Sequence, residues 1–190
     1  VDIGGGTTEI AVISLGGVVV SRSLRIAGDE MNEDIVRYSR DAFNLLIGEK
    51  TAEEVKISIG SAYSLREVMT HSIRGRDLVS GLPKEIVATD EQIREALSHS
   101  IRIIVNNIKT IIEETPPELL SDIFQRGIIL AGGGSLIRGL DRLLANQTGI
   151  PVRMMEDPLT AVVRGTGVVL EDMERLKEVL VEDHRGTPLR

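Results

Sequence analysis

The chain contains no cysteine, very few aromatic residues and no long apolar run, and each absence excludes a class of function. Without cysteine there are no disulfides, thiolate metal sites or cysteine nucleophiles, which suits a reducing compartment. Aromatic residues make up only 2% of the chain, so base-stacking surfaces for single-stranded nucleic acid are absent. Glycines, serines and charged residues interrupt every apolar stretch before it reaches the length of a membrane span.

Basic residues are also outnumbered by acidic ones. The 190 residues carry a formal net charge of −7, whereas proteins that bind nucleic acid usually present a basic face. We therefore expect no nucleic-acid partner. Hydrophobic residues (42%) and charged residues (27%) occur at the levels of a soluble globular protein, and the length allows one large domain or two small ones.

A glycine triplet follows the first apolar residues of the chain. Gly4–Gly6 comes directly after Val1–Ile3 and is followed by Thr7 and Thr8. Because glycine lacks a Cβ atom, a ligand can approach the main chain closely and positive φ is available. Successive exposed N–H groups bind anions, the threonines add hydroxyl donors, and Asp2 stands where a carboxylate could hold a metal. The pattern fits a phosphate-binding loop, and by itself it also fits a tight turn between strands.

Hydrophobic periodicity predicts the elements that follow. Residues 9–26 form a β-hairpin with Gly16-Gly17 as the two positive-φ positions of its turn. A helix runs from Gly28 to Gly48, and Thr51-Ala52-Glu53-Glu54 has the pattern of a capping box that begins a shorter helix. Two strands, residues 69–74 and 84–88, flank a loop.

The second half of the chain is predicted as helices around one buried strand. Thr89-Asp90-Glu91-Gln92 is a second capping box, and the helix behind it extends roughly 35–40 Å until Pro116 stops it. A short helix at 117–125 leads to the apolar stretch 127–131, which we expect to be a strand buried on both faces. Asp157-Pro158 begins a last helix that extends through Leu180.

A second glycine triplet, Gly132–Gly134, follows the predicted strand at 127–131 and is continued by Ser135 and a helical pattern from Leu136. Strand, glycine loop and helix N-terminus form a ligand site from backbone N–H groups and the helix dipole. Both triplets could lie at the carboxyl ends of strands in one sheet, where α/β proteins bind their ligands. The two loops together favour a nucleotide site.

These loops resemble two motifs of the actin and sugar-kinase superfamily. Asp2-Ile3-Gly4-Gly5-Gly6-Thr7-Thr8-Glu9 resembles its second phosphate motif, and Ala131-Gly132-Gly133-Gly134-Ser135-Leu136-Ile137 resembles its adenosine motif. Within the superfamily the chain resembles the MreB family of bacterial actins nearly end to end, as far as Lys177. Further stretches that support the resemblance are 25–31, 48–56, 115–119 and 156–162.

The resemblance implies an α/β fold of the actin-like ATPase type. An RNase H-like subdomain (1–28 and 89–190) would carry a smaller inserted α+β lobe (29–88). ATP and Mg²⁺ are the implied ligands, with Asp2 at the magnesium as the candidate catalytic residue and metal ligand. The implied ATP-binding residues are Gly4, Gly5, Gly6 and Thr7 at the phosphates, Glu53, Glu54 and Lys56 beside adenine and ribose, and Gly132, Gly133, Gly134 and Ser135 at the adenosine.

The same resemblance implies a slow ATPase that polymerises with itself into filaments. Such filaments lie in the cytoplasm at the inner membrane surface, act with membrane proteins of cell elongation, and control cell shape by directing cell-wall synthesis. The chain begins with Val1 inside a predicted strand, and we expect it to be the later portion of a longer protein. The family's first phosphate loop, its water-orienting carboxylate and its membrane contact belong to the earlier half, so we expect this chain alone to be inactive.

Two alternatives on the same fold are a small-molecule kinase and a chaperone-type ATPase. A kinase needs a carboxylate base facing the γ-phosphate, and the sequence offers no candidate. A chaperone would carry a peptide-binding domain after the ATPase, whereas here one predicted helix and a short charged tail follow the last strand.

Overall fold

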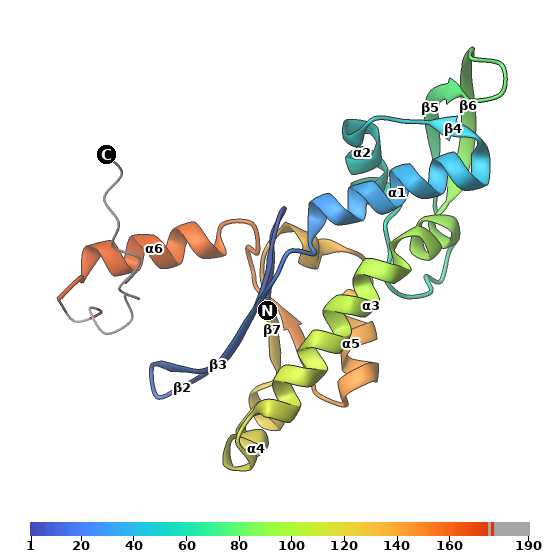
Figure 1. The fold of residues 1–190 in the computed structure, drawn as a ribbon. Helices are drawn as coiled ribbons and strands as arrows, with labels where there is room; N and C mark the ends of the chain where they lie inside the picture. Colours follow the sequence, from blue (N-terminus) through green and yellow to red (C-terminus); the bar gives the residue numbers. More distant parts are fainter. Residues whose placement is uncertain (175, 177–190) are drawn as a thin grey trace.

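Two groups of strands occupy opposite ends of an elongated molecule (Figure 1). The computed structural model describes residues 1–174 and 176. In chain order the elements are β1 (Asp2–Ile3), β2 (Thr8–Ser14), β3 (Gly17–Leu24), α1 (Gly28–Phe43), β4 (Leu45–Leu46), α2 (Glu49–Ile59), β5 (Thr70–Asp77), β6 (Pro83–Thr89), α3 (Asp90–Glu114), α4 (Pro117–Arg126), β7 (Ile128–Leu130), the 3₁₀ turn η1 (Gly133–Leu136), α5 (Leu140–Thr148), β8 (Val152–Met154) and α6 (Ala161–Glu171).

The first group of strands has the order β3-β2-β1-β7-β8. Strands β1, β2 and β3 pair antiparallel, and β7 pairs parallel with β8. A parallel bridge between Asp2 and Ala131 joins the two sets, with Ile3 N donating to Ala131 O at 2.9 Å and Ala131 N donating to Val1 O at 2.8 Å. Because β1 and β7 run in the same direction, their carboxyl ends lie side by side.

The second group, β4-β5-β6, is antiparallel and lies at the far end with α1 and α2 (Figure 1). The long helix α3 connects the two ends. Its apolar stripe is buried along the whole length, from Ile93 to Ile111. The predicted capping box at its start is confirmed: the Thr89 hydroxyl accepts from Gln92 N, and the Gln92 side chain accepts from Thr89 N.

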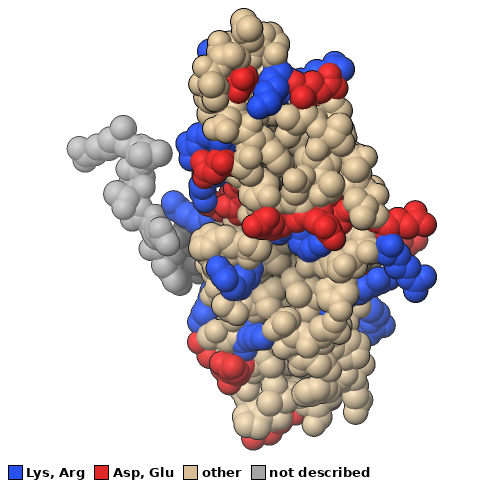
Figure 2. Space-filling model, turned by 90° about the vertical axis from the view of Figure 1, so that its right-hand side faces the viewer, with Lys and Arg blue, Asp and Glu red and all other residues tan. Residues whose placement is uncertain are grey.

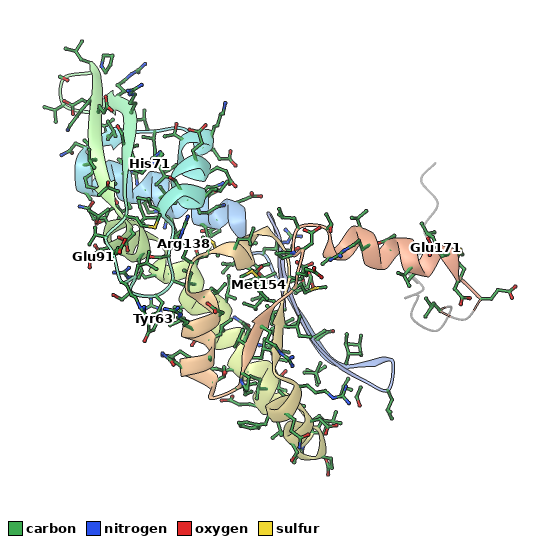
Figure 3. The ribbon with its side chains drawn as sticks, turned by 180° about the vertical axis from the view of Figure 1, so that it is seen from behind. Tyr63, His71, Glu91, Arg138, Met154 and Glu171 are labelled. Carbon is green, nitrogen blue, oxygen red and sulfur yellow. The ribbon has the colours of Figure 1, made fainter. Side chains whose placement is uncertain are left out.

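Side-chain contacts tie the two ends together beyond α3. Buried Asp34 of α1 accepts a 2.5 Å hydrogen bond from Ser100 of α3. Arg138, which precedes α5, donates to Ile57 O of α2 at 3.0 Å. The Tyr63 hydroxyl, in the loop after α2, accepts from Asn146 of α5, and Figure 3 shows Tyr63 and Arg138 in this region.

The hairpin of β2 and β3 is confirmed, but its turn was predicted one residue too late. The two positive-φ residues are Leu15 (φ 52°) and Gly16 (φ 82°), not Gly16 and Gly17. A register shift between Val12 and Ile13 moves the turn along the strand. Leu15 tolerates the left-handed conformation at the fully exposed tip of the hairpin.

Two helix boundaries also differ from the prediction. Helix α1 ends at Phe43, because Asn44 adopts the left-handed conformation (φ 51°) and the chain enters β4 before Gly48. Helix α2 begins at Glu49 directly after Gly48, so the capping box predicted at Thr51 is wrong. Thr51 lies inside the first turn of α2, where its hydroxyl cannot cap.

Around the second glycine triplet three further predictions are wrong. Strand β7 is not buried on both faces, since Ile129 is 54% exposed. No α-helix follows the triplet directly, because η1 intervenes and α5 begins only at Leu140. Asp157 is not a helix N-cap: it accepts a hydrogen bond from the Thr160 side chain, and α6 begins at Ala161. The helix was also predicted to extend through Leu180, but α6 ends at Glu171 and residues 172–174 form a turn; residue 175 and residues 177–180 lie outside the described part of the chain.

Charges of both signs are distributed over the surface. Figure 2 shows basic and acidic side chains interspersed on one face, with acidic ones gathered in a band across its middle. Among the described residues, no helix combines the length and apolar character needed to cross a membrane.

Replacing Gly132 by alanine should break the junction of β1 and β7. Gly132 has φ +80°, and a Cβ atom there would lie 2.3 Å from both Asp2 Oδ1 and Ile3 O. We expect the free energy of unfolding, measured by urea denaturation, to fall by at least about 2 kcal/mol.

Gly149→Ala is the matched control. Gly149 has a similar φ (+72°), but nothing lies within 4 Å of the added Cβ atom. It therefore carries only the backbone cost of about 1 kcal/mol. Equal losses in the two variants would show that contact with β1 is not what makes Gly132 necessary.

Candidate nucleotide-binding site

The first glycine loop turns sharply at the end of β1. Gly4 N donates to Thr7 O at 2.9 Å, which closes the loop. Gly5, Gly6 and Thr7 are exposed, and none of the three glycines has a positive φ. The triplet therefore uses the absence of side chains rather than the left-handed freedom of glycine.

This loop presents free donors. In the described part of the chain, the N–H groups of Gly5, Gly6 and Thr7 donate to no protein acceptor. Three consecutive, exposed and unpaired N–H groups are the arrangement that binds an anion. The Thr8 hydroxyl is not part of it, because buried Thr8 donates to Ile26 O at 2.7 Å.

The carbonyl groups of the loop are occupied by the start of α1. Gly28 N donates to Gly4 O at 3.1 Å, and Asp29 N donates to Gly5 O at 2.8 Å. A Cβ atom on Gly5 would lie 3.6 Å from Asp29 Oδ1, so this carboxylate stands beside the loop. The pattern of residues predicts Gly28 and Asp29 only as the start of a helix, because their adjacency to the triplet depends on the hairpin folding back.

Lys56 reaches this junction from α2. Its ammonium is buried and donates to Gly28 O at 2.8 Å and to Glu53 Oε2 at 2.9 Å. A Cβ atom on Gly28 would lie 3.3 Å from Lys56 Nζ and 3.4 Å from Gly5 Cα. The fold therefore brings the first glycine loop and the predicted Glu53 and Lys56 to one place.

Glu53 is held as a carboxylate. Burial acts to raise the pKa of Glu53, but hydrogen bonds from Lys56 and Asn32 outweigh it and leave the pKa below its ordinary value. Asn32 of α1 donates to Glu53 Oε2 at 2.7 Å. No sequence signal separates Asn32 from an ordinary polar residue of a helix, and it was missed for that reason. Glu54 is exposed on the same helix as Glu53 and pairs with no described residue.

The second glycine loop meets the first through Asp2. Gly132 packs against Asp2 and Ile3, and Gly134 packs against Ile3. The buried Ser135 hydroxyl donates to Gly132 O at 2.7 Å and so closes its own loop. Gly133 is the exposed member of the triplet. Gly132, Gly134 and Ser135 thus shape the loop, while Gly133 is open to a ligand.

Among the described residues, no group of three or more carboxylate, histidine or cysteine side chains could hold a metal ion. A metal at Asp2 would therefore need further ligands from elsewhere. Mg²⁺ is commonly held by one or two carboxylates together with phosphate oxygens and water. The half-buried Asp2, next to a phosphate-type loop, fits that donor set.

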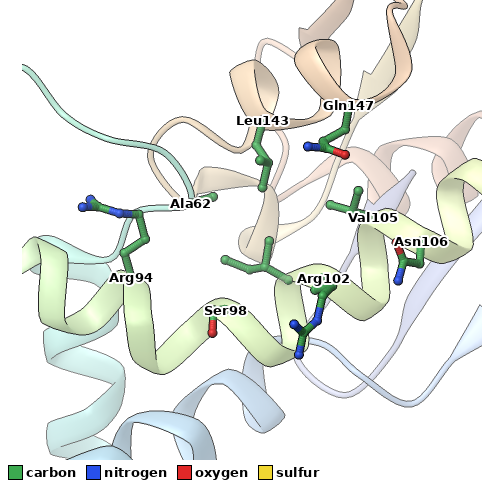
Figure 4. Close-up of a pocket in the computed structure, with 9 residues that line it drawn as sticks. Ala62, Arg94, Ser98, Arg102, Val105, Asn106, Leu143 and Gln147 are labelled. Carbon is green, nitrogen blue, oxygen red and sulfur yellow. The ribbon is translucent and has the colours of Figure 1, made fainter.

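Two cavities lie away from these residues. One, of about 340 Å³, is a groove between α3 and α5 in which Arg94, Arg102 and Gln147 surround an apolar floor (Figure 4). The other, of about 570 Å³, lies between β2, β7, α3 and α4. Neither is lined by Gly4–Thr7, Glu53, Lys56 or Gly132–Ser135.

Comparison with known proteins places the chain in a family. Residues 1–178 match the MreB/Mbl protein family. The cell shape-determining protein MreB of Escherichia coli K12 is 53% identical over 171 residues, which cover 90% of this chain and 49% of that protein. The chain spans about half the length of the curated relatives it matches.

Solved structures agree. The crystal structure of MreB5 of Spiroplasma citri bound to AMPPNP superposes on this chain with a TM-score of 0.88 at 42% sequence identity. The match covers 94% of this chain and 54% of the MreB5 chain. The MamK double helical filament gives a TM-score of 0.75 at 26% identity, with 90% and 53% covered. The predicted actin-like α/β fold is confirmed, and the chain belongs to the MreB/Mbl family of cell shape-determining, actin-like proteins.

Proposed function

We propose that the chain supplies one wall of an ATP site. The observation that carries the proposal is the row of exposed, unpaired N–H groups at Gly5, Gly6 and Thr7, at the carboxyl end of β1. The relative MreB5 was crystallised with AMPPNP and with ADP, which supports a nucleotide as the ligand. Gly4–Thr7 would bind the phosphates, and Mg²⁺ held at Asp2 would neutralise part of their charge.

The remaining residues surround the other parts of the nucleotide in this proposal. Glu53 and Lys56 on α2 would face the ribose and adenine, and the exposed Glu54 follows Glu53 on the same helix. Gly132–Ser135 would border the adenosine from the β7 end, where Gly133 is exposed. Asp2 would act at the metal in a slow hydrolysis reaction that also needs residues outside this chain, so we expect the chain alone to be inactive.

At the level of the cell we propose a filament-forming protein that controls shape. Its relatives are named cell shape-determining proteins, and MamK is described as a filament. The polymer would lie in the cytoplasm on the inner membrane, attach through segments outside this chain, and act with membrane proteins of cell elongation to direct cell-wall synthesis.

Self-association would use the two ends of the molecule. The loop between β5 and β6 exposes three apolar side chains, Leu78, Val79 and Leu82. An apolar cavity is lined by residues of β2, β7, α3 and α4, and β2 and α4 lie at the opposite end of the molecule from this loop (Figure 1). Two different, complementary surfaces at opposite ends generate an open head-to-tail polymer rather than a closed dimer.

Binding of a nucleotide can be tested by titrating AMPPNP and Mg²⁺ into the ¹⁵N-labelled chain. We expect the amide resonances of Gly5, Gly6 and Thr7 to shift most, because their N–H groups receive the phosphates. Gly6→Asp should weaken binding at least about tenfold, since it adds a carboxylate beside them.

Gly16→Asp makes the same charge change at the exposed tip of the hairpin, where nothing lies within 4 Å of the added Cβ atom. Its affinity should match the wild type. Shifts that are absent at millimolar nucleotide, or that cluster away from the glycine loops, would contradict the proposal.

Sedimentation of the chain over a range of concentrations tests the end-to-end contact. Val79→Asp places a charge on a side chain that is 82% exposed at the tip and should weaken self-association at least about tenfold. Val87→Asp is the control, because Val87 is 65% exposed on the same hairpin but away from its tip. If both variants associate like the wild type, the tip is not a contact.

A further inference from the structure

The side-chain amide of Asn32 is buried but only half paired. Asn32 is 2% exposed, and its Nδ2 donates to Glu53 Oε2 at 2.7 Å. Its Oδ1 is equally buried and has no hydrogen-bond partner among the described residues. A buried acceptor without a partner destabilises the fold. A contribution to stability therefore does not explain why an amide stands at this position. The one hydrogen bond that the Asn32 side chain makes is the one it donates to Glu53.

Two donors converge on a single oxygen of Glu53. Asn32 Nδ2 and Lys56 Nζ both bond to Oε2, at 2.7 and 2.9 Å. Oε1 accepts from no described residue, and the Glu53 side chain is 44% exposed. The carboxylate is thus held from the inside by one oxygen, while the other is available to a donor that arrives from outside.

The chemistry of the free oxygen limits what it can bind. An ionised carboxylate is only an acceptor, so it pairs with hydroxyl or amine groups and repels phosphate. Lys56 joins Glu53 to Gly28, which contacts the phosphate-type loop at Gly4 and Gly5. A ligand that puts anionic groups on the loop and hydroxyl groups on Glu53 is a nucleotide with its ribose.

We propose that Asn32 is a positioning residue that orients Glu53 toward the ribose hydroxyls and so makes the site prefer ribonucleotides. The inference rests on the proposed nucleotide site. Lys56 cannot set this orientation alone, because its ammonium rotates and is shared with Gly28 O. The planar amide of Asn32 fixes the direction. Rotating the Asn32 amide by 180° would place its Oδ1 against Glu53 Oε2, and the two oxygens would repel each other. The Glu53 carboxylate therefore fixes the orientation of the amide in turn.

The experiment compares affinities for ATP and for the dideoxy analogue that lacks both ribose hydroxyls, by the ¹⁵N titration. The wild-type chain should bind ATP at least about tenfold more tightly. Asn32→Asp keeps the shape and replaces the donor by a carboxylate that repels Glu53, and Asn32→Ala removes the amide without adding a charge. In each variant the two affinities should agree to within about twofold. The affinity for the dideoxy analogue should change little.

Ser39→Ala is the matched control. Ser39 lies on the same helix and makes a buried hydrogen bond to Leu45 O. Its removal should lower the stability of the chain and leave the preference for ATP unchanged. If Asn32 had only a structural role, its replacement would lower the affinities for ATP and for the dideoxy analogue by the same factor and leave the preference for ATP unchanged.

The outcomes separate the two proposals. If the wild type binds neither nucleotide, the proposed nucleotide site fails. If it binds ATP but shows no preference, or if Asn32→Asp and Asn32→Ala keep the wild-type preference, the site stands and the role of Asn32 is refuted. Loss of the preference in both Asn32 variants, with Ser39→Ala unchanged, supports the proposal.

Discussion

The parallel pairing of β1 with β7 determines where both glycine loops lie. The bridge joins Asp2 to Ala131, which are far apart along the chain. Parallel neighbours end on the same side of a sheet, so the loops that leave β1 and β7 emerge next to each other. An antiparallel arrangement would place them at opposite edges. The candidate site is therefore a consequence of strand direction before it is a consequence of any side chain.

The two glycine triplets look alike in sequence but meet different physical requirements. In the first, Gly5 and Gly6 are exposed and a side chain would meet only ordinary contacts, so the missing Cβ atoms leave room for an incoming group. In the second, Gly132 and Gly134 are buried against β1, and a Cβ atom on either would overlap it. The first triplet keeps a surface open, and the second allows the loop after β7 to pack against β1.

Local patterns predicted well what local interactions decide. The capping box at Thr89 and the apolar stripe of α3 depend on residues three or four positions apart, and both are confirmed. The same capping pattern at Thr51 is misleading, because Gly48, three residues earlier, is the N-cap of α2. Gly48 ends no helix, since Asn44 adopts the left-handed conformation first. In both cases a neighbouring residue determines the helix boundary: Gly48 is the N-cap of α2, and Asn44 ends α1.

Contacts between distant segments were beyond the reach of sequence patterns. The resemblance gave a role in the site to Glu53 and Lys56 but not to Asn32, Gly28 or Asp29. Asn32 meets Glu53 only after α1 packs beside α2, and Gly28 and Asp29 reach the first glycine loop only because the hairpin folds back. Assignments that rest on the resemblance, including Glu54 and the lobe boundary near Ala88, stay predictions. Residues such as Ser135 show the limit of a motif, since its buried hydroxyl serves its own loop.

The buried ammonium of Lys56 explains why these distant segments keep one arrangement. A buried cation is tolerated only when acceptors replace the water it has lost, and here one is a carbonyl of α1 and the other a carboxylate of α2. Sliding α1 against α2 would separate the Gly28 carbonyl from Lys56 and the Asn32 amide from Glu53, so the buried ammonium would keep Glu53 as its only acceptor. The pair therefore contributes more to the precision of the junction beside the first glycine loop than to net stability.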